Sequence, residues 1–280
     1  MVLVTHNRRT SVLDVLERLM ALPERPPVVV VDNASTDGTA AAVGRRWPRV
    51  RVVALAVNAG SAARNVGARL ASTPYVAFND DDSWWAPGAL ERAAATFETH
   101  PCVALVAARL LVGESNRPDS TCAAMARSPL PDGSGLPGRP VLGFVACGAI
   151  VRRDPFLAAG GFRRCFGIGG EEELLALDLA AAGWALRYID DIVAHHHPSS
   201  ARDSEGRKAI EIRNRLWTAW LRRPASVCLA ETLRVATAGH RHSRRRALAG
   251  ALAGLPWCLR NRRVVPPALE RQVRLLKTES

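Results

Sequence analysis

The sequence predicts an α/β fold in which an open, mostly parallel sheet is sandwiched between helices and followed by a helical, basic extension. Two observations predict it. Short apolar runs that are typical of buried strands alternate with amphipathic segments across residues 1–82. Polar side chains follow these runs where they end, as expected for a parallel sheet that is covered on both faces and binds ligands at one edge.

The first four strands and their connecting helices can be assigned in order. The strands are predicted within residues 1–6, 26–35, 49–55 and 74–80, and the helices within 10–22, 36–47 and 58–72. The first helix has apolar residues at Val12, Leu16 and Leu19. Thr10 or Ser11 is its expected N-terminal cap.

The chain between Val112 and Pro140 is rich in proline, glycine and serine and has no clear period. Such a stretch inside a compact domain is usually a lid, a binding loop or a disordered segment. After it we expect a strand within 141–153, a helix at the glutamates of 167–184, and a strand that ends in the histidines of 185–200. The remaining residues, 201–280, are expected to be helical.

Composition excludes several classes of protein. The 280 residues are 48% hydrophobic, which is enough for a well-buried core. The 6 cysteines include no C-x-x-C pair, so neither a zinc site nor a secreted disulfide framework is expected, and a cytoplasmic location fits best. No apolar run approaches the roughly 18 residues that span a bilayer, and no signal peptide is recognisable.

The net charge of +12 belongs to residues 201–280, because basic and acidic residues balance in residues 1–200. The basic segments mix arginine with leucine and tryptophan, which suits peripheral binding to the anionic inner face of the plasma membrane. The alternative is a helical cap that packs on the preceding domain and keeps a solvated basic face. Nucleic-acid binding is not expected, because no recognised module accompanies the charge.

Three adjacent carboxylates, Asp80, Asp81 and Asp82, follow an apolar run in the stretch FNDDDSWW. Adjacent acids repel one another, so a fold that gathers them usually supplies a cation or hydrogen-bond donors. Mg²⁺ and Mn²⁺ prefer carboxylate oxygens and leave positions open for phosphate oxygens. Asp80 and Asp82 can point the same way while Asp81 points elsewhere. The alternative is a solvated acidic turn that caps the next helix through Ser83. The two tryptophans that follow, Trp84 and Trp85, either form a wall of the site or pack against that helix.

Two further clusters can serve the same site. Glu171 to Glu173 follow two glycines and fall in a first helical turn, where the helix dipole alone explains acidic residues. One of them can instead act as a general base toward an acceptor hydroxyl. Three histidines end the last strand and alternate sides, so at most two share a face. We assign a metal-binding role to His195 and His197.

Six stretches occur in order along the chain: VLVTHNR, VVVVDNASTDGT, NAGSAARNVGARLA, PYVAFNDDDSWWAPGAL, VRRDPFLAAGGF and GGEEELLALDLAAAGW. Together they resemble the motifs of family 2 glycosyltransferases, enzymes of the GT-A fold. The resemblance covers roughly residues 1–200. It implies a Rossmann-like GT-A catalytic domain with a nucleotide-binding half at 1–110 and an acceptor-binding half at 111–200, followed by the basic extension at 201–280.

The resemblance implies an inverting transfer of a hexose or deoxyhexose from a nucleotide-diphosphate sugar, with Mg²⁺ or Mn²⁺, as in the synthesis of cell-envelope polysaccharides. The acceptor is a hydroxyl of a glycan, a lipid-linked sugar or a small molecule. By their match to family motifs, the expected donor-binding residues are Thr5, Asn7 and Asp32 at the base, Arg64 at the base or diphosphate, and Asp80 at the ribose. Asp82 completes the DXD motif and is expected to bind the metal.

The family's base motif falls on Glu172, where an aspartate is common. Leu174 also departs from the pattern, and Glu171 and Glu173 stay open as alternative bases. In the expected mechanism Glu172 takes the acceptor proton while the metal neutralises the leaving diphosphate. A retaining route would need a nucleophile and an acid paired at short range, and the sequence suggests no such pair.

Two other functions remain open. A nucleotidyltransferase has a similar sheet and metal, but a glycine-rich phosphate loop is expected after its first strand, and THNRRTS contains no glycine. A non-catalytic protein that binds nucleotide sugars is the second alternative, because Glu172 and Leu174 depart from the family pattern. The donor and acceptor depend on the pocket around residues 112–140 and 147–149.

Overall fold

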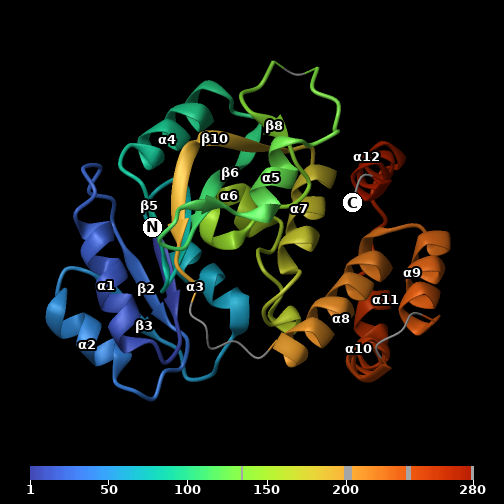
Figure 1. The fold of residues 1–280 in the computed structure, drawn as a ribbon, viewed down its shortest axis with the longest axis horizontal. Helices are drawn as coiled ribbons and strands as arrows, with labels where there is room; N and C mark the ends of the chain where they lie inside the picture. The colour runs from blue at the N-terminus through green and yellow to red at the C-terminus, as the bar shows by residue number, and fades with distance from the viewer. Residues whose placement is uncertain (134, 199–203, 238–240, 279–280) are drawn as a thin grey trace.

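The chain is represented by a computed structural model that describes residues 1–133, 135–198, 204–237 and 241–278. A central sheet lies between helices, and further helices form the C-terminal end of the molecule (Figure 1). The predicted fold class, an α/β sheet with a helical C-terminal extension, is therefore confirmed.

The N-terminal half is the predicted parallel sheet. Its strands are β1 (Val2–Thr5), β2 (Val29–Asp32), β3 (Arg51–Ala54) and β4 (Tyr75–Asp80), paired in the order β3-β2-β1-β4. The connecting helices are α1 (Arg9–Met20), α2 (Thr39–Arg46) and α3 (Ala63–Leu70). Thr5 pairs with Asp32, and Val4 pairs with Asp80, so the carboxyl ends of these three strands are level at one edge of the sheet.

The second half extends the same sheet with mixed direction. The added strands are β9 (Ala149–Arg152), β6 (Val103–Val112), β10 (Ala185–His196) and β5 (Ser83–Trp85), in that order after β4. Strand β9 runs antiparallel between β4 and β6, whereas β10 is parallel to β6. The end of β10 pairs with β5, which follows the three aspartates directly. The predicted histidine and aspartate clusters are therefore neighbours.

Three local expectations are wrong. Helix α1 starts at Arg9, so Thr10 and Ser11 lie inside it, and no side chain in the described structure caps it. Ser83 belongs to β5 rather than capping a helix; α4 (Ala89–Thr99) begins later, after Gly88 at φ 79°. The stretch 112–140 is not one irregular loop, because it contains β7 (Arg117–Pro118), α5 (Ser120–Ala126) and β8 (Arg139–Pro140).

Two backbone segments meet closely beside the carboxyl edge of the sheet. They are η1 (Gly60–Ala62) and the turn after η3 (Arg164–Phe166). Ser61 donates from its amide and its hydroxyl to the carbonyl of Gly167, at 2.9 and 2.7 Å. A Cβ on Gly60, where φ is 59°, would lie 2.8 Å from the Gly167 oxygen, so only glycine fits there.

Helix α7 (Glu171–Ala181) carries the glutamate cluster and follows two glycines in left-handed conformations, Gly169 at φ 109° and Gly170 at φ 80°. Positive φ angles explain why the sequence needs glycine at both positions. The remaining central helices are η2 (Ala146–Gly148) before β9 and α6 (Arg153–Ala158) after it. Helix α7 therefore begins at the same edge of the sheet as the aspartates.

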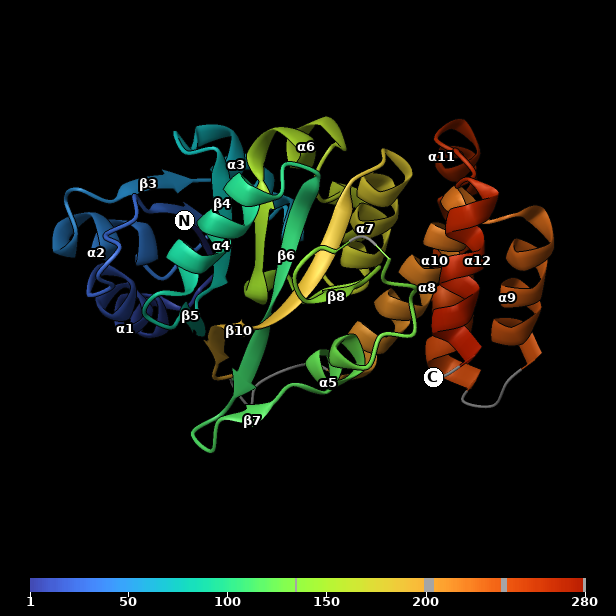
Figure 2. The ribbon, with the colours of Figure 1, turned by 90° about the horizontal axis from the view of Figure 1, so that it is seen from above.

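The C-terminal helices pack together beside α7 at one end of the molecule (Figure 2). They are α8 (Ser204–Arg222), α9 (Ala225–Thr237), α10 (Arg241–Ala253), α11 (Leu255–Arg260) and α12 (Pro267–Thr278). A second hydrophobic core joins Phe166 and Leu174 to Trp217 and Trp220 of α8. The domain boundary predicted at residue 200 lies outside the described residues. No described helix is long and apolar enough to cross a membrane.

Several arginines of this extension have internal roles. Arg222 forms an ion pair with Asp178 of α7, and Arg223 pairs with Glu270 of α12 with both side chains less than 10% exposed. Removing one partner of such a buried pair is strongly destabilising, because it leaves the other charge uncompensated. Part of the C-terminal positive charge thus holds the extension to itself and to α7.

Asn214 connects α8 to the turn before α7, and its replacement tests this connection. Its fully buried amide donates to the carbonyls of Phe166 and Gly169, at 2.9 and 2.6 Å. Asn214→Leu should lower the free energy of unfolding by about 2 kcal/mol, because two buried acceptors lose their donor. Urea denaturation measures the change. The exposed neighbour Arg215→Leu is the control; equal stability of both variants would contradict the prediction.

Candidate functional site

The carboxyl edge of the sheet borders a cavity of about 330 Å³, which we call the acidic cavity. Five of the predicted site residues line it: Thr5, Arg64, Asp80, Asp82 and Glu172. The other four, Asn7, Asp32, His195 and His197, do not belong to its lining. The structure therefore brings five of the predicted site residues together around one cavity and leaves the other four outside its lining.

Arg64 of α3 is the buried cation of the cavity. Its side chain is 9% exposed and forms an ion pair with Asp80 at the end of β4. Burial opposes its charge, but the carboxylates of Asp80, Glu171 and Glu172 together raise the pKa of the guanidinium. Arg64 is thus held permanently charged at the point where the acids of two different elements converge.

Asp81, which the sequence left as a neighbour of the DXD pair, also lines the cavity. Its carboxylate accepts a hydrogen bond from the Thr5 hydroxyl at 2.8 Å. Burial raises the pKa of Asp81 to about 6, helped by the negative charges of Asp82 and Asp80 and opposed by the Thr5 hydrogen bond. Thr5 therefore contacts an acid of the cavity, and burial is the main reason that the pKa of this acid is raised.

The histidine that faces the aspartates is His196, not His195 or His197. Its Nε2 lies 3.3 Å from the Asp82 carboxylate, and both side chains are almost buried. The distance is short but the geometry is not that of a hydrogen bond, so this buried nitrogen has no hydrogen-bond partner among the described residues. Successive residues of a strand face opposite sides, so His196 alone of the three points to the acidic cavity.

His195 and His197 pack on Trp84 of β5. The ring of His195 stacks on the indole at 5.3 Å, with Nδ1 3.0 Å from the Asn116 side-chain oxygen, and His197 lies at 4.7 Å from the same indole. The other tryptophan, Trp85, is buried and donates to Asn79. Neither tryptophan lines the acidic cavity, so the metal-binding roles predicted for His195 and His197 do not fit this arrangement.

Asn7 and Asp32 support the turns that border the cavity. Asn7, at φ 52°, accepts a hydrogen bond from the Thr36 amide at 2.7 Å and donates from its own amide to Ser35. The buried Asp32 carboxylate accepts from the Ser35 amide at 3.0 Å. Asn7 thus ties the turn after β2 to the end of β1, and Asp32 stabilises that turn from within, but neither residue lines the cavity.

The glutamates of α7 differ sharply in surroundings. Glu171 is buried, and its carboxylate accepts from the amide of Gly169. Burial, reinforced by the charge of Glu171, raises the pKa of Glu172 to about 7, while Arg64 and the Ala146 amide act in the opposite direction. Glu173 does not line the cavity. Of the three candidates, Glu172 thus combines access to the cavity with a pKa near neutrality, as proton transfer requires.

Other lining residues had no role assigned from the sequence. Asn33 donates to the Asn58 side chain at 3.0 Å and accepts from the Ala59 amide, which joins β2 to the segment before α3. Both asparagines lie where predicted strands end, and this position was the signal that could have identified them as site residues. Cys147 also lines the cavity, within the range 147–149 named from the sequence, whereas residues 112–140 contribute nothing to it.

The side chains of the acidic cavity can hold a divalent cation when a bound phosphate supplies further ligand atoms. Among the described residues no group of three or more His, Cys, Asp or Glu is arranged to hold a metal ion. Asp82 and His196 nevertheless converge, with a buried nitrogen that lacks a hydrogen-bond partner in the described chain. Mg²⁺ and Mn²⁺ commonly bind one or two protein carboxylates and complete their coordination with phosphate oxygens and water. Asp82 and His196 alone therefore provide too few metal ligands, and phosphate oxygens are needed to complete the site.

Comparison with protein families gives one match. The sequence profile of the family described as Glycosyl transferase family 2 matches residues 1–158, which is more than half of the chain. A search of curated proteins finds no match.

Solved structures show the same fold at low sequence identity. The mannosyltransferase PcManGT from Pyrobaculum calidifontis, in complex with GDP-Man and Mn²⁺, has a TM-score of 0.60 and 18% identity, covering 99% of this chain and 85% of that chain. TarS 1-349 from S. aureus, in complex with UDP-GlcNAc, has a TM-score of 0.59 and 18% identity, covering 90% and 70%. This chain spans 42% of the longer TarS structure.

Proposed function

The chain belongs to glycosyl transferase family 2, and on that basis we propose that it transfers a sugar from a nucleotide-diphosphate sugar to an acceptor hydroxyl with inversion. The observation that carries the proposal is the acidic cavity, where Glu172 and the pair Asp82 and His196 line one space of about 330 Å³. A proton acceptor and a place for a diphosphate thus lie side by side. The proposed sugars are hexoses or deoxyhexoses.

The donor is proposed to bind along the carboxyl edge of the sheet. Asp80, fixed by Arg64, suits the ribose hydroxyls, because a carboxylate accepts hydrogen bonds from two of them. Thr5 contributes through its hydrogen bond to Asp81. Asn7 and Asp32 act indirectly, by fixing the turn that borders the nucleotide. PcManGT was solved with GDP-Man, and TarS 1-349 was solved with UDP-GlcNAc. Both ligands are nucleotide sugars, which supports a nucleotide-sugar donor here.

Asp82 and His196 are proposed to hold Mg²⁺ or Mn²⁺ together with the diphosphate oxygens. The bound cation would neutralise the charge that develops on the leaving diphosphate. PcManGT was solved with Mn²⁺, which supports a divalent metal here. The remaining chemistry comes from the protein's own side chains.

Glu172 is proposed to remove the proton from the acceptor hydroxyl as its oxygen attacks the anomeric carbon. The half-buried position keeps the carboxyl pKa at about 7, so the ionised form is available and basic near neutral pH. Glu171 is held by the Gly169 amide and sets the negative potential that keeps Glu172 basic. A single carboxylate base supports a one-step displacement, which inverts the anomeric centre.

Glu172→Gln tests the assignment of the base. The variant should lose about 100- to 10,000-fold in kcat, the range expected for loss of a general base. In the wild type kcat/KM should fall as the pH drops through about 7, because protonated Glu172 cannot accept a proton, and the variant should lack this acid limb. Release of nucleoside diphosphate from a panel of nucleotide sugars and acceptors provides the rates.

The control for this experiment is Glu173→Gln, which changes an acid of the same helical turn that does not line the cavity. Its kcat and pH profile should match the wild type. Unchanged turnover of Glu172→Gln would remove Glu172 as the base. A wild type that binds nucleotide sugars but turns none over would favour a binding protein.

The metal assignment predicts different roles for two neighbouring histidines. His196→Ala should weaken Mn²⁺ binding in the presence of a nucleoside diphosphate by about tenfold, because one nitrogen ligand is lost. His195→Ala, on the opposite face of β10, should leave the affinity unchanged. Electron paramagnetic resonance measures free Mn²⁺ during the titration. Equal affinities for both variants would contradict the choice of His196.

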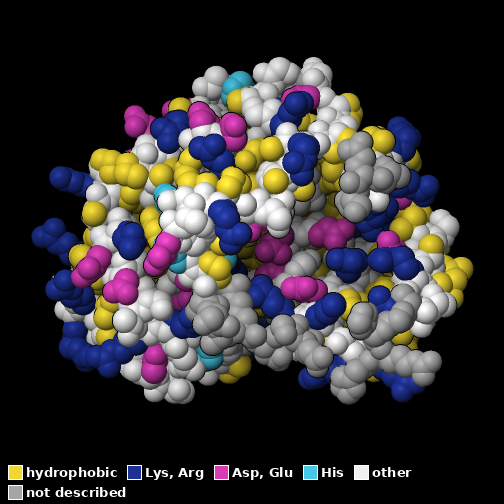
Figure 3. All heavy atoms as spheres, viewed as in Figure 1, with side chains coloured by type: hydrophobic (Ala, Val, Ile, Leu, Met, Phe, Trp, Pro, Cys, Tyr) yellow, Lys and Arg dark blue, Asp and Glu magenta, His cyan; other side chains and the backbone are white. Residues whose placement is uncertain are grey.

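The C-terminal helices are proposed to rest on an anionic membrane surface. Large exposed apolar side chains recur on them, including Leu229 and Leu233 one turn apart on α9 and Leu259 on α11. Figure 3 shows one face of the molecule, and at its C-terminal end Lys and Arg side chains lie among apolar side chains. Apolar insertion combined with basic charge is typical of interfacial helices.

Vesicle binding tests this surface. Replacing Leu229 and Leu233 together by serine should weaken co-sedimentation with phosphatidylglycerol vesicles about tenfold, because apolar area no longer enters the bilayer. Val57→Ser is the control, since Val57 is 60% exposed but lies in the N-terminal half. Binding of the wild type should also fall with added salt. Equal binding to vesicles of pure phosphatidylcholine would contradict an anionic membrane partner.

A further inference from the structure

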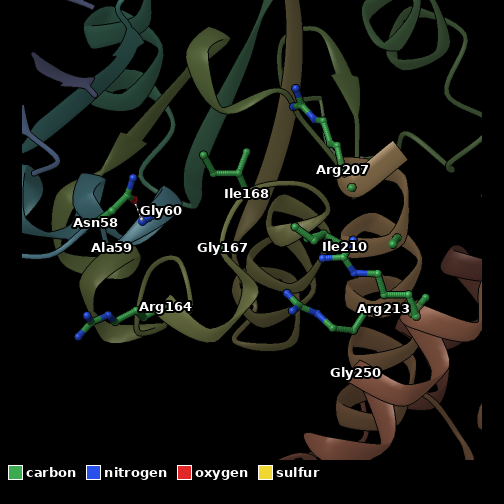
Figure 4. A pocket seen from close by; sticks show the side chains of 14 residues that line it. Asn58, Ala59, Gly60, Arg164, Gly167, Ile168, Arg207, Ile210, Arg213 and Gly250 are labelled. Carbon is green, nitrogen blue, oxygen red and sulfur yellow. Dashed lines mark hydrogen bonds between the residues drawn. The ribbon is translucent and has the colours of Figure 1, made fainter. Parts of the chain in front are cut away.

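A second cavity, of about 810 Å³, adjoins the acidic cavity and has the opposite charge. Figure 4 shows it between the Asn58 to Gly60 segment and Ile168 on one side and α8 on the other. Among the residues that the structure describes, its lining includes no aspartate or glutamate but four arginines: Arg164, Arg207, Arg213 and Arg246. We call it the arginine cavity.

The two cavities share part of their walls. Asn58, Gly60, Ile168 and Arg207 line both of them. A molecule seated in the arginine cavity therefore lies next to the acidic cavity, whose lining includes Glu172, the second residue of α7. The arginine cavity thus adjoins the proposed base.

The cationic side chains come from different elements and are held in place to different degrees. Arg213 of α8 donates to the carbonyls of Cys165 and Phe166 and stacks over the Trp217 ring at 4.3 Å. Arg207 forms an ion pair with Glu211 at 3.3 Å, and that glutamate is not part of the lining. One rigid and one solvated guanidinium therefore border the same space.

Arg164 and Arg246 are exposed and form no ion pair with any residue that the structure describes. Burial lowers the pKa of Arg213, so its charge is also poorly compensated within the protein. Guanidinium groups bind phosphate oxygens through paired hydrogen bonds, and a phosphate carries a charge of about −1.5 to −2 near neutral pH. The described lining of the cavity therefore presents positive charge that phosphate groups can neutralise.

We propose that the arginine cavity is the acceptor subsite and that the acceptor carries phosphate groups close to the hydroxyl that receives the sugar. The inference rests on the proposed glycosyl transfer and adds the chemical class of the acceptor. A phosphorylated sugar or polyol chain and a phosphate-bearing lipid share this chemistry. The volume of about 810 Å³ accommodates either with its anionic groups on the arginines and its hydroxyl toward Glu172.

The test measures binding with the donor site filled. Fructose 1,6-bisphosphate and fructose are titrated into the full chain by calorimetry, with Mn²⁺ and saturating nucleoside diphosphate present. The bisphosphate should bind and fructose should not. Arg246→Gln and Arg164→Gln should each weaken bisphosphate binding about five- to tenfold, the cost of one charge-assisted contact. Arg245→Gln, an exposed arginine next along α10 that is not in the lining, should bind like the wild type.

Several results would overturn the proposal. These are bisphosphate binding that occurs only when nucleoside diphosphate is left out, tighter binding of the dicarboxylate glucarate, or equal effects of Arg246→Gln and Arg245→Gln. A comparison of water-soluble short-chain phosphatidic acid with glycerol 3-phosphate identifies the source of the phosphate. Tighter binding of the lipid that depends on Arg246 supports a lipid-borne phosphate. Equal binding of the two compounds supports a soluble phosphorylated acceptor. Nucleoside diphosphate binding by the wild type is measured first; its absence would contradict the glycosyl transfer itself, independently of the arginine cavity.

Discussion

The buried ion pair between Arg64 and Asp80 is the interaction on which the acidic cavity depends. Five carboxylates from two chain segments line that space: Asp80, Asp81, Asp82, Glu171 and Glu172. Without a nearby cation, these carboxylates would repel one another or remain protonated. Arg64 supplies that cation from α3, and its raised pKa reflects attraction from acids of both segments. The pKa values of Asp81 and Glu172 are nevertheless raised, chiefly by burial and further by neighbouring carboxylates, so Arg64 compensates these acids only in part.

Much of the fold and the position of the site could be predicted from the sequence, because both depend on local patterns. Buried strands and amphipathic helices follow from the period of apolar residues, and acids at strand ends must meet at one edge of a parallel sheet. Val12, Leu16 and Leu19 are fully buried, as their spacing predicts.

Other features depend on long-range geometry that one sequence does not contain. Whether His195 or His196 faces the aspartates is set by how β10 pairs with β6 and β5, and β10 carries an irregularity between Ile189 and Val193 that shifts its alternation. The supporting role of Asn7 likewise arises from a contact between the end of β1 and the turn after β2. The arginine cavity could not be located because it joins residues more than 180 positions apart, from Asn58 to Gly250.

The backbone contact of Gly60 with Gly167 forms part of the border between the two cavities. This part of the border admits only glycine at position 60, while the far wall of the arginine cavity consists of residues on α8 and α10. In evolutionary terms, sequence drift in these C-terminal helices can alter which molecules enter without disturbing the sheet edge. If the two cavities serve as proposed, a change of acceptor and retention of the donor site can therefore fall to separate parts of one chain.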